Sequence, residues 1–234
     1  MKTTPASFFV IVNKDITRIN NPMIAVLPQI PTFEYILNLM NLLKCLIIIL
    51  VIVSTSSDAQ NFDLPVPQKW TTETFPIPIE FAPEIKYKGE EHVRFSPGWG
   101  DSKSEELWTY FFMWWINADS EITEKTLTDY LQYYYSGLVG RNIIRRKIDS
   151  ALVVPTIARV VKSDKIISSG NEYIAEVQML DYLSLKPITL NVNIQVIRCD
   201  NEHIAALFAV SPQPRSHPLW VELQSMQQGF KCNK

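Results

Sequence analysis

The run WTYFFMWW, residues 108–115, is apolar on both faces when it is built as a strand. Successive side chains of a strand point to opposite sides of the sheet. One face carries Trp108, Tyr110, Phe112 and Trp114. The other face carries Thr109, Phe111, Met113 and Trp115. A strand without a polar face predicts an inner strand that is covered on both sides. An exposed aromatic surface that grips a ligand is the alternative. Helices can cover one face, and a proline-rich segment, a ligand or a partner must then cover the other.

The second half of the chain has the alternating pattern of an antiparallel meander. At 188–196, five apolar residues alternate with four polar ones, which predicts a strand with one buried and one wet face. Residues 173–179 alternate in the same way, and the apolar stretch 152–161 is interrupted by Pro155. A short turn at 199–202 then leads to a strand at 203–210.

Two segments have the period of amphipathic helices. Thr123 is the expected N-cap of the first, and Gly137 or Gly140 its expected end. In the second, Pro218 suits the first helical position and Gly229 the position just past the end. The apolar stripes are Leu127, Tyr130, Leu131, Tyr134 and Leu138, and Leu219, Trp220, Leu223 and Met226.

These elements predict an α+β fold for residues 91–234: an antiparallel sheet of six or seven strands with both helices on one face. The chain of 234 residues is 47% hydrophobic with a net charge of -2, which is enough for one ordinary core. It has no block of five or six like charges, so no nucleic-acid partner is expected.

Residues 60–90 are predicted to form a proline-rich arm with an edge strand. Five prolines fall within twenty residues, and proline gives no amide hydrogen to a helix or to a sheet. Phe75, Ile77, Ile79 and Phe81 alternate with polar residues or prolines, which indicates an edge strand laid against the core.

Residues 40–59 have the layout of a secretory signal peptide: Lys44, an apolar run at 46–53, and small residues ending in Asp58-Ala59-Gln60. The run is shorter than the roughly 20 residues that a membrane span needs. We therefore expect cleavage after Ala59, no stable span afterwards, and a periplasmic or secreted protein. A signal anchor is the alternative. Cys45 follows Lys44, which does not fit a lipoprotein signal.

Residues 1–39 show scattered prolines and no sustained period. Met40 is therefore expected to be the true start, with the upstream residues not part of the native chain. A long disordered leader is the alternative.

Two cysteines, Cys199 and Cys232, remain after the signal. The strand at 203–210 runs out and the last helix returns over a similar length, so Cys232 is expected near the turn that carries Cys199. An even pair in an oxidising compartment predicts a disulfide; two free thiols are the alternative.

The chain has no recognisable catalytic, nucleotide or metal motif. Its three histidines, His92, His203 and His217, lie in separate elements, so neither a metal site nor a cofactor is expected. Paired carboxylates at 105–106 and at Asp200 and Glu202 fall in turns that are expected to be solvated. The three consecutive basic residues at 145–147 either contact an anion or lie on a solvated surface.

The segments VRFSPGWGDSKSEELWTYFFMWWI and LTDYLQYYYSGLV combine a Phe-x-Pro-Gly turn, a Trp-x-Tyr strand and a Tyr-Tyr helix end. Over 92–139 they resemble a group of exported proteins of gram-negative bacteria for which no activity is known. The resemblance implies export and a shared fold, and it transfers no site residues.

Two functions of different classes follow. The first is a non-catalytic binding protein whose partner is a protein, a glycan or an apolar ligand, because aromatic surfaces mark recognition sites. Its candidate residues are His92, Arg94, Trp99, Trp108 and Tyr110. The second is a periplasmic hydrolase-like enzyme built around His92 and nearby acids.

Overall fold

The computed structural model describes residues 61–117, 119, 122–164 and 170–233, all within one compact unit. The predicted leader, 1–39, and the predicted signal peptide, 40–59, lie outside the described residues. Within the described ranges, no helix has both the length and the apolar character needed to cross a membrane.

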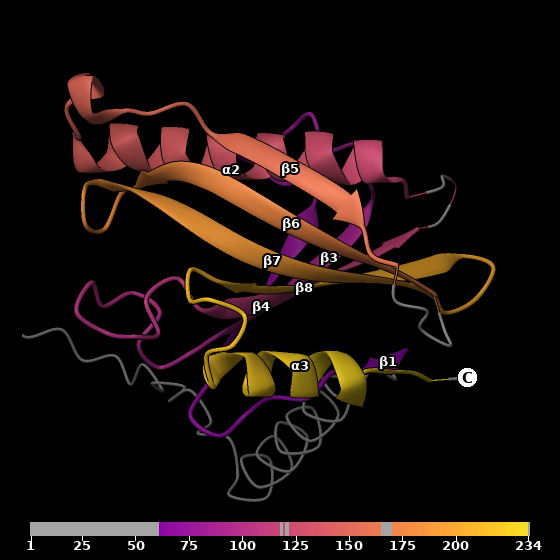
Figure 1. Ribbon diagram of the computed structural model, residues 1–234. Coiled ribbons are helices and arrows are strands. Elements are labelled where there is room, and N and C mark those ends of the chain that lie inside the picture. The colour runs from indigo at the N-terminus through magenta and orange to yellow at the C-terminus, as the bar shows by residue number, and fades with distance from the viewer. Residues whose placement is uncertain (1–60, 118, 120–121, 165–169, 234) are drawn as a thin grey trace, which may run out of the picture. The chain divides into compact units, whose positions relative to one another are not determined.

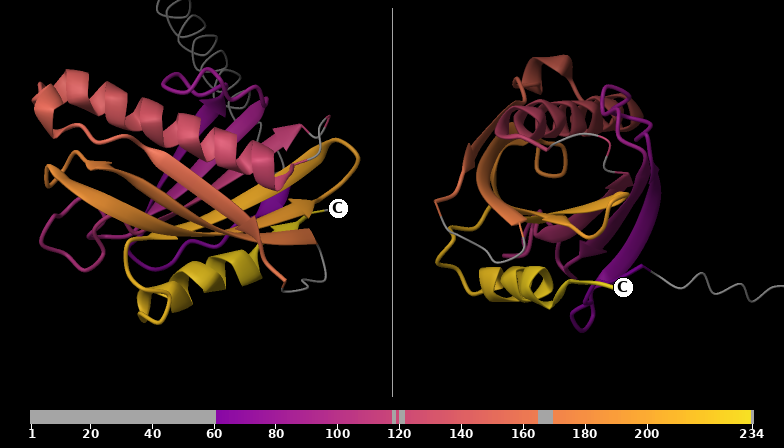
Figure 2. Two further views of the ribbon diagram at one scale, coloured as in Figure 1. Left: turned by 45° about the horizontal axis from the view of Figure 1, so that its top comes forward. Right: turned by 90° about the vertical axis from the view of Figure 1, so that its right-hand side faces the viewer.

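The main sheet has seven antiparallel strands in the order β2-β3-β4-β8-β7-β6-β5 (Figure 1). Its strands are β2 (Thr71–Ile77), β3 (Gly89–Phe95), β4 (Tyr110–Asn117), β5 (Ile157–Lys162), β6 (Gly170–Asp181), β7 (Lys186–Arg198) and β8 (His203–Ser211). The sheet is strongly curved, and helix α2 (Glu124–Arg146) lies across its concave side (Figure 2). The α+β class and the number of strands are as predicted.

A second, two-stranded sheet joins β1 (Phe62–Asp63) to β9 (Lys231–Cys232). It lies next to the C-terminal end of helix α3 (Leu219–Gly229) (Figure 1). Helix α3 covers the convex side of the main sheet. The Cα atoms of Cys199 and Cys232 are 5.5 Å apart and their sulfur atoms are at disulfide distance. The predicted pairing of the two cysteines is therefore confirmed in its geometry.

The aromatic strand β4 is buried on both faces between its neighbours β3 and β8. Tyr110, Phe112 and Trp114 belong to the core beneath α2. The other face belongs to the core beneath α3; its residues are Phe111, Met113 and Trp115. The prediction that the run forms an inner strand covered on both sides is thus confirmed.

One detail of the predicted fold is wrong, because the two helices lie on opposite faces of the sheet. Strands β4 and β8 are buried almost throughout and have no polar face. Apolar area on both sides must be removed from water, and one helix can cover only one side.

The proline-rich arm contributes to both cores rather than to one. Phe62 and Trp70 pack beneath α3, whereas Ile79 and Ile85 pack beneath α2. The edge strand begins earlier than predicted, at Thr71. It ends at Ile77, just before Pro78.

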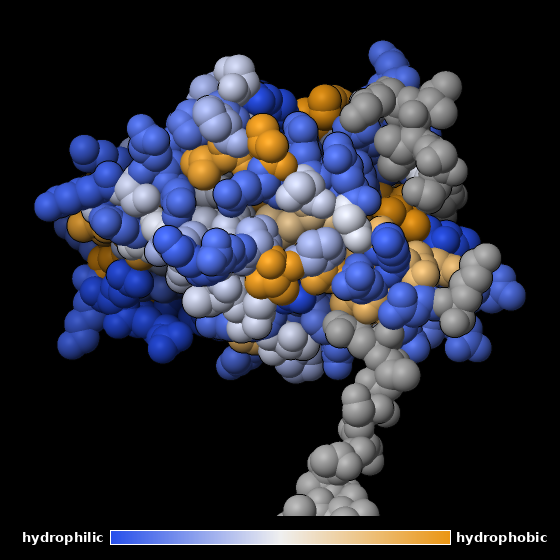
Figure 3. Space-filling view, turned by 90° about the horizontal axis from the view of Figure 1, so that it is seen from below, coloured by the Kyte–Doolittle hydropathy of each residue, from blue (hydrophilic) through white to orange (hydrophobic). Residues whose placement is uncertain are grey.

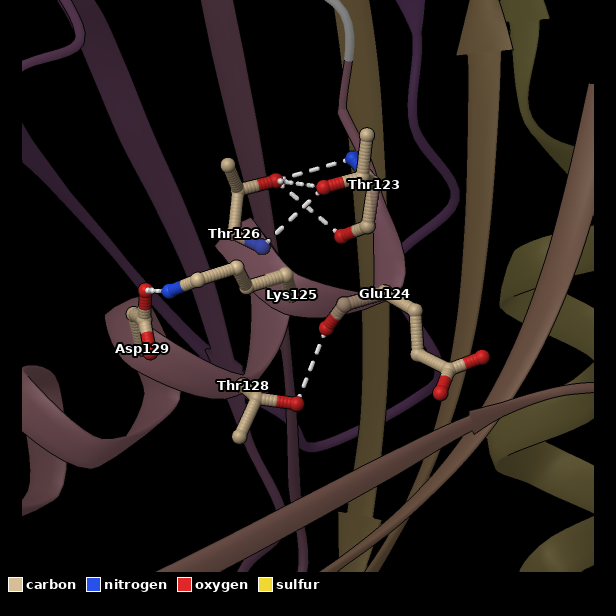
Figure 4. Close-up of polar contacts among 6 residues, drawn as sticks. All are labelled: Thr123, Glu124, Lys125, Thr126, Thr128 and Asp129. Atoms are coloured by element: carbon tan, nitrogen blue, oxygen red, sulfur yellow. Dashed lines mark hydrogen bonds and ion pairs between the residues drawn. The ribbon is translucent and has the colours of Figure 1, made fainter.

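Helix α2 begins as predicted at Thr123, which forms a capping box with Thr126 (Figure 4). The Thr126 N–H donates to Thr123 Oγ1 at 3.2 Å, and the Thr123 N–H donates to Thr126 Oγ1 at 2.8 Å. Two helix-end N–H groups thereby gain partners.

The predicted end of α2 at Gly137 or Gly140 is wrong, since the helix continues to Arg146. A Cβ atom on residue 137 would lie 1.7 Å from the Phe81 carbonyl oxygen. Gly137 therefore lets the arm approach the helix closely, at a cost of about 1 kcal/mol in helix propensity. Lys147, in the left-handed conformation, caps the end instead.

The meander is close to its prediction. Tyr173, Ala175, Val177 and Met179 are buried on β6, and alternate residues from Leu190 to Val196 are buried on β7. The stretch predicted at 152–161 divides into a short 3-10 turn, Ser150–Leu152, and β5.

Candidate ligand-binding site

A cavity of about 420 Å³ lies between the concave side of the sheet and the C-terminal half of α2. Strands β2, β3 and β4 form its floor, and residues 76–81 of the arm form one wall. Three of the predicted binding residues, Trp99, Trp108 and Tyr110, line it. We call it the aromatic cavity.

The α3 side of the molecule shows no large continuous apolar surface (Figure 3). In the view from the α3 side, hydrophilic side chains predominate and the apolar ones form small separate groups (Figure 3). Trp108 and Tyr110 are only 1% and 3% exposed. The aromatic run therefore does not form an open surface, and its contribution to any ligand site is the wall of the aromatic cavity.

Trp108 is fixed in that wall by a buried hydrogen bond. Its backbone φ is 56°, an unusual value for a residue with a side chain, and its indole Nε1 donates to Asp181 Oδ1 at 2.8 Å. Asp181 also accepts from the backbone N–H groups of Leu183 and Ser184. The Tyr182 ring meets the Trp108 ring edge-on, with 5.1 Å between centroids.

Tyr110 is held by the hydroxyl of Tyr135 on α2, to which its own hydroxyl is hydrogen-bonded. Burial raises the pKa of both hydroxyls well above 10, so both stay protonated in ordinary buffers. This bond joins the floor of the aromatic cavity to α2.

Sequence reasoning missed the most unusual residue of the aromatic cavity, Glu91. Its side chain is 2% exposed, and it lies opposite Phe75 of β2 and Trp114 of β4. The signal was the period of two, which places Glu91 on the same face as Val93 and Phe95. A single glutamate in a charged stretch is normally solvated, and so its position drew no prediction.

Burial raises the pKa of Glu91 to about 7. The Tyr134 hydroxyl and the Trp114 indole lie near the carboxyl and partly offset this effect. By distance and angle, however, neither Glu91 Oε1 nor Trp114 Nε1 forms a well-aligned hydrogen bond with another described residue. Buried polar atoms without a partner are rare in folded proteins and call for an explanation.

Two arginines of α2 complete the aromatic cavity. The Arg141 guanidinium lies 4.5 Å from the centroid of the Phe81 ring, and Arg146 lies 5.2 Å from that of Tyr182. Arg141 Nε is buried and has no hydrogen-bond partner in the part of the chain that the structure describes. Neither arginine forms an ion pair within that part. Of the three consecutive basic residues at 145–147, Arg146 thus lines the aromatic cavity.

The remaining predicted residues, His92 and Arg94, lie on the opposite face of β3. His92 Nδ1 is 3.2 Å from Thr74 Oγ1, and its Nε2 is 3.1 Å from a Glu90 carboxylate oxygen. Burial lowers the pKa of His92, although the neighbouring Glu90 opposes this. Arg94 is buried, its pKa is lowered by burial, and its Nη1 donates to the Val93 carbonyl. The five predicted binding residues therefore form two groups on opposite sides of the sheet.

Over the described residues, no three histidine, cysteine, aspartate or glutamate side chains converge as metal ligands would. No family model, no curated protein and no solved structure matches the chain. The aromatic cavity therefore has to be interpreted from its own chemistry.

Proposed function

We propose that this protein is an exported binding protein that holds a small, largely apolar ligand in the aromatic cavity. The observation that carries the proposal is the combination of aromatic walls with a buried polar atom, Arg141 Nε, that has no hydrogen-bond partner among the described residues. Small-molecule sites are commonly apolar cavities of roughly 300–1,000 Å³ with a few convergent polar groups. A bound ligand would give that atom the partner it lacks.

Export is supported by the sequence of residues 40–59 and by the cysteine pair at disulfide distance. Disulfides persist in oxidising compartments such as the periplasm and the extracellular space. A ligand carrier in such a compartment needs no catalytic group, in keeping with the non-catalytic prediction.

Filling the aromatic cavity tests this function. The protein is expected to bind the neutral dye Nile red with a rise in fluorescence, and Leu138→Trp is expected to weaken binding at least tenfold. The added indole occupies space in the wall that α2 contributes, and it leaves the charges unchanged. Fluorescence titration gives the dissociation constants, and circular dichroism checks the fold.

The matched control is Ile144→Trp on the same helix, where the side chain is 78% exposed and does not line the aromatic cavity. It should bind the dye as the parent does. If overpacking unfolds Leu138→Trp, the smaller Leu138→Phe replaces it. A folded variant with undiminished affinity would contradict the proposal.

The hydrolase alternative has one supporting observation, the contacts of His92 with both Thr74 and Glu90. A hydroxyl, an imidazole and a carboxylate in sequence can generate a nucleophile. His92 does not line the aromatic cavity, however, and its ring packs against the Phe62 ring with 4.9 Å between the centroids. Release of nitrophenol from nitrophenyl esters, lost in His92→Ala and kept in the parent, would favour this alternative over binding alone.

A further inference from the structure

The polar groups of the aromatic cavity are unequal in charge. Arg141 and Arg146 each bring a guanidinium group to the cavity, and no carboxylate among the described residues forms an ion pair with either. Of the charged residues that line it, Glu73, Glu80 and Arg146 are exposed, Arg141 is half-buried and Glu91 is buried. Solvent screens exposed charges much more than buried ones. Burial raises the pKa of Glu91 to about 7, so below that pH Arg141 is the least screened charge of the aromatic cavity, whose interior favours an anion.

The guanidinium groups are also placed for ligand contact. The Arg141 guanidinium lies over the Phe81 ring and that of Arg146 over the Tyr182 ring, and Arg146 Nε donates to Asn142 Oδ1 at 3.4 Å. Their remaining N–H groups can contact a ligand. Guanidinium edges match the two oxygens of a carboxylate or a phosphate. Arg141 Nε, which is buried and has no partner among the described residues, is one such donor.

We infer that the ligand is an amphipathic anion, whose oxyanion group binds Arg141 and Arg146 and whose apolar body lies against Trp108, Tyr110 and Val93. This inference rests on the proposed function and names the class of its ligand. The opposite class, an amphipathic amine, would use Glu91 as its partner. It is disfavoured because Arg141, whose Nε is buried without a partner among the described residues, lies in the same cavity, and the raised pKa of Glu91 leaves that carboxyl largely neutral below pH 7.

Ligands that share one alkyl chain and differ in head group test the inference. Isothermal titration calorimetry at neutral pH should give decanoate or decyl phosphate an affinity at least tenfold above that of decanol, and decylamine the weakest binding. Arg141→Gln and Arg146→Gln should each weaken binding of the anions about tenfold, the size of one charge-assisted hydrogen bond. Decanol binding should change less than about twofold in both variants. The ratio of the affinities for decanoate and for decyl phosphate shows whether the site prefers a carboxylate or a phosphate group.

Arg145→Gln is the matched control, since it removes the same charge from the neighbouring position, which does not line the aromatic cavity. It should keep the affinity for decanoate. Equal affinities for decanoate and decanol, unchanged in Arg141→Gln, would overturn the anion inference and leave the binding function standing. Tightest binding of decylamine, lost in Glu91→Gln, would also overturn it. Failure of all four ligands and of Nile red would instead contradict the proposed function.

Discussion

Phe112→Ala is expected to lower the free energy of unfolding by about 3–5 kcal/mol, the usual cost of deleting a fully buried phenylalanine ring. The Phe112 side chain is 0% exposed. Its ring stacks on Phe208 of β8 at 4.3 Å and on Tyr134 of α2 at 5.4 Å. Phe112 thus joins β4 and β8 to helix α2, which covers them. Its loss leaves a void that the flanking rings cannot fill without moving.

Urea unfolding followed by tryptophan fluorescence measures the loss. Phe75→Ala is the matched control, because it deletes the same ring from an edge strand where the side chain is 41% exposed. Its cost should be at most about 1 kcal/mol. Equal losses in the two variants would contradict the burial of β4 beneath α2.

The elements of this fold are mostly local, and local patterns predicted them. The period of two at 173–179 and 188–196 marks β6 and β7, and the capping threonine at 123 marks the start of α2. The absence of a polar face at 108–115 correctly predicts a strand covered on both sides. Each of these features depends on neighbours within a few residues, which the sequence displays directly.

Relations between distant strands were not predictable in the same way. His92 pairs with Met113 and Arg94 with Phe111, which puts both side chains on the α3 side of the sheet, whereas Tyr110 faces α2. A shift of the register by one residue would reverse these faces, and register is set by long-range packing. The structure therefore places His92 and Arg94 on the other side of the sheet from Trp99, Trp108 and Tyr110, which come together in the aromatic cavity.

Glu91→Gln is expected to remove a pH dependence from the stability of the protein. The folded-state pKa of Glu91 is about 7, against an ordinary value of 4.5. Below about pH 4.5 the carboxyl is protonated in both states and contributes no difference. As the pH rises from there to about 7, the unfolded chain ionises while the folded protein holds its proton. The folded state therefore loses about 3 kcal/mol relative to the unfolded chain.

Urea unfolding at about pH 4 and about pH 8 measures this difference. The parent should lose about 3 kcal/mol more than Glu91→Gln between the two conditions. Glu73→Gln is the control: it removes an exposed carboxyl on the adjacent strand and should follow the parent within about 0.5 kcal/mol. Parallel pH profiles for the parent and Glu91→Gln would contradict the raised pKa.

The same measurement bears on the ligand. The groups nearest to Glu91 are Tyr134 and Tyr135 of α2 and Trp114 of β4, none of which carries charge at these pH values. If Glu91 keeps its proton up to about pH 7, Arg141 is the least screened charge of the aromatic cavity below that pH. Anion affinity should then fall as the pH rises through 7, because ionised Glu91 begins to oppose the bound oxyanion. In Glu91→Gln that fall should be absent, and calorimetric titration of decanoate on either side of pH 7 distinguishes the two.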